Sequence, residues 1–128
     1  MMRTQSDAAI GIQAASLAGE LLLQLRQAAV TGEATSAALD ADALRAAGDR
    51  DANHAIMKLL TNERPEDSLL SEEAADDPRR LIADRVWIID PLDGTREFGE
   101  RDGAGVWRDD FAVHVALWER GQGLTLGV

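Results

Sequence analysis

The sequence contains no cysteine and no tyrosine, and aromatic residues make up only 4% of its 128 residues. The absence of cysteine excludes disulfides and thiolate metal sites. With three Trp and two Phe, the core must be built mainly from Leu, Ile, Val and Ala. Because hydrophobic residues make up 45% of a chain of this length, we expect one compact, soluble domain.

Basic residues are scarce relative to acidic ones, 13 against 23, which gives a formal net charge of −10. This balance argues against nucleic acid polymers and anionic membranes as partners, because both bind basic faces. It is compatible with divalent cations. The N-terminal segment shows no continuous apolar run of membrane-spanning length, because Gln13, Ser16 and Glu20 interrupt it. We therefore expect a cytoplasmic protein with no membrane partner.

The hydrophobic pattern predicts two helices near the N-terminus. Residues 7–30 form the first, because apolar side chains recur there at spacings of three and four residues. Its apolar stripe comprises Ile10, Ala14, Leu17, Leu21 and Leu25. The small, polar segment 31–48 is typical of a loop with at most a short helical turn. A second helix is expected over 49–63, with Asp49 at its N-terminal end, where negative charge suits the helix dipole, and Pro65 beyond its end.

Four later segments indicate β-strands. Residues 68–71 are short and apolar, and the continuous apolar run 86–89 indicates a strand buried on both faces. Side chains of 111–119 alternate between two faces, and 124–128 begin a further strand. We therefore expect an α+β fold, a layered α/β sandwich in which two N-terminal helices pack on a mostly antiparallel sheet. Because the chain ends inside its last predicted strand, we expect that sheet to be incomplete at the C-terminus.

Acidic residues follow two of these predicted strands. Glu72 and Glu73 come after the first, and Asp90 and Asp93 come after the run 86–89. If the two strands are neighbours in one sheet, these carboxylates lie together, and they repel each other unless a cation joins them. Oxygen ligands select hard cations such as Mg²⁺, and the backbone carbonyl of Leu92 can add to the set.

The residues after Asp93 suggest an anion site. If Gly94 and Thr95 open a helix, their backbone N–H groups point outward and favour a phosphate. A cation site beside a phosphate site is typical of metal-assisted hydrolysis of phosphate esters. Simpler interpretations remain open, because an Asp-Gly pair after a strand is commonly a hairpin turn and adjacent glutamates are commonly solvated. A two-carboxylate glycosidase also remains open, although it would not explain the Gly-Thr pair.

Taken together, "LLSEE" (69–73) and "WIIDPLDGTREF" (87–98) closely resemble the inositol monophosphatase-like superfamily of Mg²⁺-dependent, lithium-sensitive phosphatases. The resemblance covers roughly residues 8–128 and corresponds to about the N-terminal half of a member. Within the superfamily, "DGTREF" looks more like the CysQ-type 3'(2'),5'-bisphosphate nucleotidases, which follow DGT with a basic residue and Glu-Phe.

The resemblance implies metal ligands in this sequence. Glu72, Asp90, Asp93 and the carbonyl of Leu92 would hold two or three Mg²⁺ ions in a complete site. Glu73 would support Glu72 without binding the metal itself.

The resemblance also implies the catalytic groups. Asp93, Gly94 and Thr95 would bind the substrate phosphate, and the Thr95 hydroxyl, oriented by Asp49, would position the attacking water. Glu72 would contribute to catalysis through its metal. The family usually has Thr or Ser two residues before this aspartate, where this chain has Ala47.

Several other side chains are weaker candidates for a functional role. Arg96 and Arg101 are candidates for a second substrate phosphate. Trp107 is interpreted as covering apolar surface, although stacking on a nucleobase is the functional alternative. His54 and His114 have no metal-like spacing and are interpreted as structural.

One departure from the family concerns its downstream Trp-Asp motif, which supplies a further metal-binding aspartate before small residues. The "WRDD" at 107–110 lies in the wrong place and lacks the small residues. We therefore expect residues 1–128 to be the N-terminal metal- and phosphate-binding portion of a phosphatase, with the C-terminal half absent and little activity by itself.

The function implied is that of a Mg²⁺-dependent phosphomonoesterase, specifically a 3'(2'),5'-bisphosphate nucleotidase. It would hydrolyse 3'-phosphoadenosine 5'-phosphate to AMP and phosphate, in sulfur assimilation. The alternatives are an inositol monophosphatase, or an inactive fragment or non-enzymatic cation-binding domain. The expected partner is a small phosphorylated substrate, a nucleoside bisphosphate or an inositol phosphate, and a homodimer is possible for a full-length protein.

Overall fold

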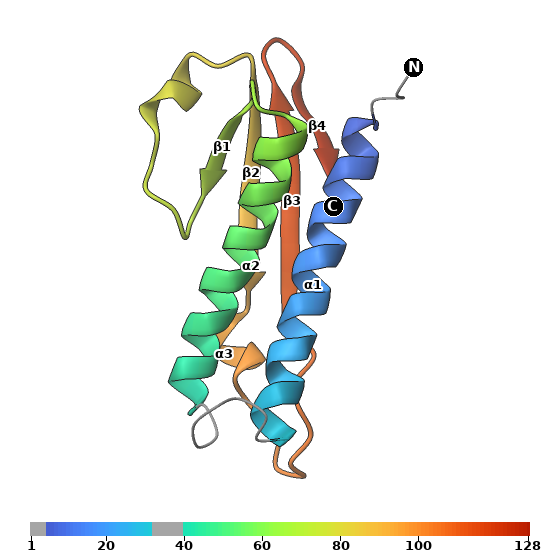
Figure 1. Ribbon diagram of the computed structural model, residues 1–128, viewed down its shortest axis with the longest axis vertical. Coiled ribbons are helices and arrows are strands. Elements are labelled where there is room, and N and C mark those ends of the chain that lie inside the picture. Colours follow the sequence, from blue (N-terminus) through green and yellow to red (C-terminus); the bar gives the residue numbers. More distant parts are fainter. Residues whose placement is uncertain (1–4, 32–39) are drawn as a thin grey trace.

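The structure is a computed structural model and describes residues 5–31 and 40–128. Two long helices pack against one four-stranded sheet, which confirms the predicted α+β class (Figure 1). In chain order the elements are α1 (Asp7–Thr31), α2 (Ala41–Glu63), β1 (Ser68–Ser71), the 3-10 helix η1 (Pro78–Leu81), β2 (Arg85–Asp93), α3 (Thr95–Phe98), β3 (Ala112–Glu119) and β4 (Gly123–Gly127).

The sheet has the order β1-β2-β3-β4 and is mostly antiparallel, as predicted. Only β1 and β2 run parallel, with Ser71 opposite Ile89. Because parallel strands end at the same edge of a sheet, the residues that follow β1 and those that end β2 lie close together. This edge therefore carries the acidic residues singled out above.

Helix α1 confirms the predicted span and part of the predicted stripe, because Ile10 and Ala14 are fully buried and Leu25 packs against the core. Its buried side chains are spaced every four residues, namely Ile10, Ala14, Ala18 and Leu22, and they face α2 and the sheet. Leu17, which was predicted to lie inside, is 41% exposed. Ala18, the next residue along the helix, is fully buried instead.

Helix α1 also corrects the expectation that no apolar segment has membrane-spanning length. By length and composition alone, its residues Asp7–Ala29 are apolar enough to cross a membrane, although we expected no such run. The polar Gln13 and Ser16 lower the mean hydropathy too little to prevent this. One such helix near an N-terminus is weak evidence for a span, because core helices meet the same criterion, and α1 packs against α2, β3 and β4.

Helix α2 begins earlier than predicted, at Ala41. The Asp40 side chain caps it by accepting a hydrogen bond of 2.7 Å from the backbone N–H of Ala43. Asp49 therefore lies about two turns inside the helix, and the prediction that it meets the dipole at the helix N-terminus is wrong. The predicted end before Pro65 is confirmed. The rest of the predicted loop, 32–39, lies outside the described residues.

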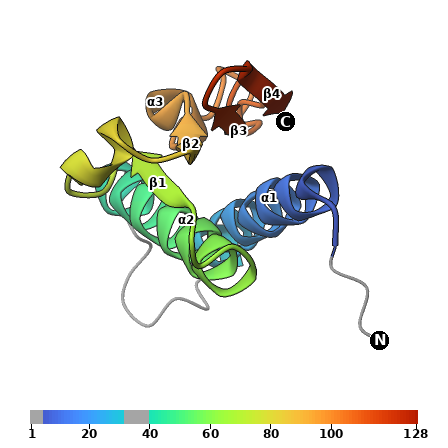
Figure 2. The same cartoon turned by 90° about the horizontal axis from the view of Figure 1, so that it is seen from above.

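Strand β2 is buried on the face toward the helices but only partly on the other, whereas both faces were predicted to be buried. Trp87 and Ile89 are buried in the core against the helices. Both long helices lie on the same side of the sheet (Figure 2). On the opposite face, Val86 is 6% exposed and Ile88 is 36% exposed. The alternation predicted for β3 is confirmed, with Val115 and Leu117 buried in the same core.

Candidate active site

The candidate site lies where β2 ends. The pairing with β3 shifts between Asp90 and Asp93, because three steps along β2 match two steps along β3. This β-bulge turns the end of the strand and separates the directions of the two aspartates. Gly94 follows with a φ of +86°, in the left-handed region that favours glycine. A Cβ atom there would lie 2.8 Å from the carbonyl oxygen of Asp110, so the position has no room for a side chain either.

Two predicted residues meet across this turn. The Thr95 hydroxyl lies 3.0 Å from Asp49 Oδ1 and 3.1 Å from the carbonyl oxygen of Leu92. Asp49 comes from the middle of α2, which packs against both β2 and α3. The charged carboxylate is the stronger acceptor of the single hydroxyl proton. The structure therefore forms the Thr95–Asp49 contact that the resemblance implies.

The carboxylates around this contact repel each other. Burial raises the pKa of Asp49, and the nearby charge of Asp90 raises it further, against the opposing hydrogen bond from Thr95. Burial also raises the pKa of Glu73, with added repulsion from Asp49, Glu72 and Asp90. Raised pKa values of this kind are expected where carboxylates lie close to one another without a compensating positive charge.

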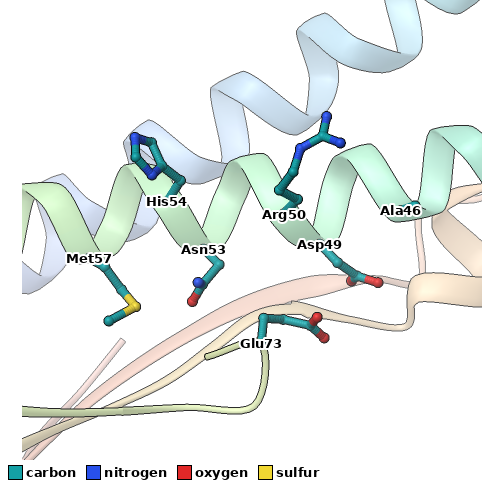
Figure 3. Close-up of a pocket in the computed structure, with 7 residues that line it drawn as sticks. All are labelled: Ala46, Asp49, Arg50, Asn53, His54, Met57 and Glu73. Atoms are coloured by element: carbon teal, nitrogen blue, oxygen red, sulfur yellow. The ribbon is translucent and has the colours of Figure 1, made fainter. Parts of the chain in front are cut away.

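A pocket of about 580 Å³ opens between α2 and the turn that follows β1 (Figure 3). Figure 3 shows Asp49, Asn53 and Met57 pointing from α2 toward the side on which Glu73 lies. Arg50 and His54 point away from Glu73. The lining residues are Ala46, Asp49, Arg50, Asn53, His54, Met57 and Glu73.

The two glutamates are placed differently from each other. Both side chains are exposed. Glu73 lines the pocket, whereas Glu72, the predicted ligand, is absent from that lining. Glu72 is still near enough for its charge to raise the pKa of Glu73. The end of β1 is fixed by Ser71, which bonds Asn53 on α2. The direct role of Glu72 stays a prediction.

Asp93 lies on the exposed side of the bulge. Its Oδ2 is 3.1 Å from Nε2 of His114 on β3. His114 was interpreted as structural from the sequence, and the structure gives it this contact because the two residues are brought together by the β2–β3 pairing. The contact could be predicted only from the register between β2 and β3, and the sequence spacing of the two residues does not give that register.

A divalent cation fits the chemistry of these residues. Asp90 Oδ1 is buried and has no hydrogen-bond partner, a costly arrangement that an ion would relieve. The available donors are carboxylate and carbonyl oxygens, which hard cations prefer. Within residues 5–31 and 40–128, however, no three His, Asp or Glu side chains converge as a ready metal site. Binding would therefore require these side chains to turn toward the ion.

The predicted phosphate-binding arginines have protein partners. Arg96 bonds Glu100 at 3.0 Å, and Arg101 stacks over the ring of Trp107 at 4.5 Å. Trp107 also lies 5.1 Å from the guanidinium of Arg26, a buried residue of α1. Trp107 thus packs between two arginines and covers apolar surface in this structure.

Comparison with known proteins agrees with this arrangement. The model of the inositol monophosphatase family matches residues 3–128. The chain is 51% identical over 118 residues to a 3'-phosphoadenosine 5'-phosphate phosphatase of Mycobacterium leprae, covering 92% of this chain and 39% of that protein. It is 36% identical over 113 residues to the 3'(2'),5'-bisphosphate nucleotidase CysQ of Salmonella typhimurium, covering 86% of this chain and 42% of that protein.

A solved structure gives the same result. CysQ from Bacteroides thetaiotaomicron superimposes with a TM-score of 0.72 at 35% identity, over 97% of this chain and 41% of that one. The chain thus spans about two fifths of the length of the relatives it matches. Because the family model matches nearly the whole sequence, the chain belongs to the inositol monophosphatase family.

Proposed function

We propose that residues 1–128 form the metal- and phosphate-binding portion of a Mg²⁺-dependent phosphomonoesterase. The observation that carries the proposal is the Thr95–Asp49 contact of 3.0 Å beside the unpartnered Asp90 oxygen. The substrate we propose is a 3'(2'),5'-bisphosphate nucleotide, with 3'-phosphoadenosine 5'-phosphate hydrolysed to AMP and phosphate. The names of the relatives from Mycobacterium leprae and Salmonella typhimurium support this choice.

The metal would be held by Asp90, Asp93, Glu72 and the carbonyl of Leu92, and a complete site would take two or three Mg²⁺ ions. Bound Mg²⁺ supplies charge to the phosphate and acidity to a coordinated water. Glu73 would keep Glu72 in place. Both Asp93 and Glu72 are exposed, so their side chains have room to turn toward an ion, and Asp93 would give up its contact with His114 to do so.

Thr95 would position the attacking water. Because its hydroxyl proton is directed at Asp49, the remaining lone pairs of Thr95 Oγ1 can accept a hydrogen bond from a third group. A water that donates to Thr95 is held with its own lone pair free to face the phosphorus. Asp49 keeps Thr95 in this orientation, and its raised pKa suits a group that takes up part of a proton during the reaction.

Gly94 and Thr95 would bind the phosphate through their backbone N–H groups. These groups open the first turn of α3, where N–H groups have no partner inside the helix. The absence of a Cβ at Gly94 allows an oxygen to approach the backbone closely.

The proposal extends to the setting of the protein. Its partner would be a small phosphorylated substrate, it would act in the cytoplasm in sulfur assimilation, and lithium would inhibit it. A homodimer is proposed for a full-length protein.

The site is tested by titrating Mg²⁺ into the 128-residue chain by calorimetry, with and without inorganic phosphate. We expect phosphate to tighten Mg²⁺ binding in the wild type, and Asp90→Asn to abolish the effect. Asp84→Asn is the matched control, because Asp84 is exposed and pairs with Arg120 at 3.1 Å. A wild type that binds neither ligand would overturn the proposal, in favour of a solvated turn.

The substrate class is tested by the same titration with adenosine 3',5'-bisphosphate and with inositol 1-phosphate in place of phosphate. Tighter binding of the bisphosphate is expected. The reverse order would favour an inositol monophosphatase, the rival suggested by the name of the family. Phosphate release from 3'-phosphoadenosine 5'-phosphate should be slow with these residues alone, and robust turnover would contradict the assignment of the chain as one portion of the enzyme.

A further inference from the structure

One face of α2 contacts both segments of the candidate site. Asp49 and Asn53 are four residues apart and therefore lie on the same side of the helix. Figure 3 shows both side chains directed toward the side of Glu73. Asp49 meets Thr95, which follows β2, and Asn53 meets Ser71, which ends β1. The helix thus fixes two separate segments with two adjacent turns.

The contact between Asn53 and Ser71 has a defined direction. Ser71 is only 6% exposed, and its hydroxyl donates a hydrogen bond of 2.5 Å to Asn53 Oδ1. The same hydroxyl oxygen accepts the backbone N–H of Glu73 at 3.3 Å. Because the hydroxyl has one proton and Asn53 receives it, the lone pairs of the oxygen are left for the N–H of Glu73.

The pairing of β1 with β2 places Ser71 close to the aspartates of the candidate site. Ser71 is paired with Ile89, the residue immediately before Asp90. The turn of Glu72 and Glu73 therefore starts beside Asp90. Ser71 accepts the Glu73 N–H through its hydroxyl oxygen and the Ala74 N–H through its carbonyl oxygen. We propose that Asn53 and Ser71 are positioning residues, which hold the Glu72–Glu73 turn beside the Asp90 end of β2. The catalytic meaning of this inference rests on the proposed function, but the positioning itself does not.

A purely structural role is the alternative, since a buried hydroxyl needs a partner wherever it lies. The two roles differ in what a substitution changes. If the Ser71 hydroxyl bonds Asn53 only because a buried hydroxyl needs a partner, replacing Ser71 changes the free energy of unfolding and leaves the turn unchanged. If Ser71 positions the turn, its loss changes the turn locally, and threonine, which keeps the hydroxyl, restores it.

The first measurement is amide hydrogen exchange at Glu73 by NMR, which needs no metal. We expect Ser71→Ala and Asn53→Ala to speed this exchange by about fivefold relative to other amides of the turn, the factor for one ordinary hydrogen bond. Ser71→Thr should restore the wild-type rate. The matched controls are Ser68→Ala at the start of β1 and Asn62→Ala near the end of α2, and both should leave the rate unchanged.

The second measurement uses Mn²⁺ with inorganic phosphate as a paramagnetic probe in the same chain. In the wild type, we expect the amide signals of Glu72, Glu73 and Asp90 to broaden. In Ser71→Ala, the broadening at the two glutamates should fall severalfold while that at Asp90 persists. Absence of broadening in the wild type would refute the proposed function but not the positioning role, which is tested by the exchange rates. Unchanged exchange at Glu73 in both Ser71→Ala and Asn53→Ala would overturn the inference.

Discussion

Gly48 allows α2 to pack closely against the segment that carries the candidate site. It is buried in the middle of α2, directly before Asp49. A Cβ atom at this position would lie 2.7 Å from Phe98 Cε1, 3.1 Å from Leu92 Cδ2 and 3.2 Å from Leu22 Cδ2. These three contacts come from α3, β2 and α1, so they cannot all be relieved by the movement of one side chain. We predict that Gly48→Ala destabilises the fold.

The size of the effect follows from two opposing contributions. Alanine stabilises a helix interior by about 0.5–1 kcal/mol relative to glycine. Overpacking a filled core costs about 1–3 kcal/mol. The net change for Gly48→Ala is therefore a loss of between about 0 and 2.5 kcal/mol. Gly19 in α1 is the matched control, because a Cβ there would meet nothing within 4 Å, and Gly19→Ala should gain about 0.5–1 kcal/mol.

The assay is urea unfolding followed by tryptophan fluorescence, since Trp87 is fully buried. The quantity to compare is the difference in unfolding free energy between the two variants, expected at about 1–3 kcal/mol with similar dependence on urea. Equal stabilisation by both alanines would refute the argument, because it would mean that α2 can retreat from Phe98 and Leu92 at no cost.

Two further substitutions test the electrostatics and the aromatic packing. Burial and Asp90 raise the pKa of Asp49, so its stabilising contribution is present below pH 3.8 and is lost as the pH rises through the raised value. Asp49→Asn should therefore stabilise the chain more at pH 7 than at pH 3, and a constant difference in urea unfolding would contradict this. Arg26 stacks on three aromatic rings, at 4.7 to 5.5 Å, and donates to a backbone carbonyl at 2.7 Å. Arg26→Lys should lower the unfolding free energy by about 1–2 kcal/mol, whereas the exposed Arg50→Lys should change it by less than about 0.5 kcal/mol.

The elements that were predicted correctly have strong local signals. The end of α2 follows from Pro65, and β3 follows from its regular alternation. The apolar run 86–89 located β2 but not its end, because the strand continues through Asp90 to Asp93 before Gly94. The contact of Thr95 with Asp49 was implied by the family resemblance, since 46 residues separate the two in sequence.

The features that were missed depend on neighbours rather than on local pattern. The start of α2 required recognition of Asp40 as a cap before an alanine-rich segment. The exposure of Ile88 depends on whether a second layer covers the sheet, which a run of apolar residues does not reveal. Likewise, the Asn53–Ser71 bond joins residues 18 apart on different elements. The ligand roles of Glu72 and Asp93 stay predictions, because the structure leaves both side chains exposed.

The two ends of β2 carry opposite electrostatics, and this division explains how the fold tolerates the candidate site. At its start, Arg85 bonds Asp7 at 2.8 Å, Asp67 at 3.0 Å and Glu119 at 2.6 Å, and it lowers the pKa of Asp7. Asp7 therefore stabilises the fold at neutral pH, and this contribution is lost as the pH falls through its lowered pKa. At the other end, the acids near Asp90 repel each other and destabilise the fold at neutral pH. A cation bound there would remove that repulsion without disturbing the Arg85 end, so the binding free energy would appear directly as added stability.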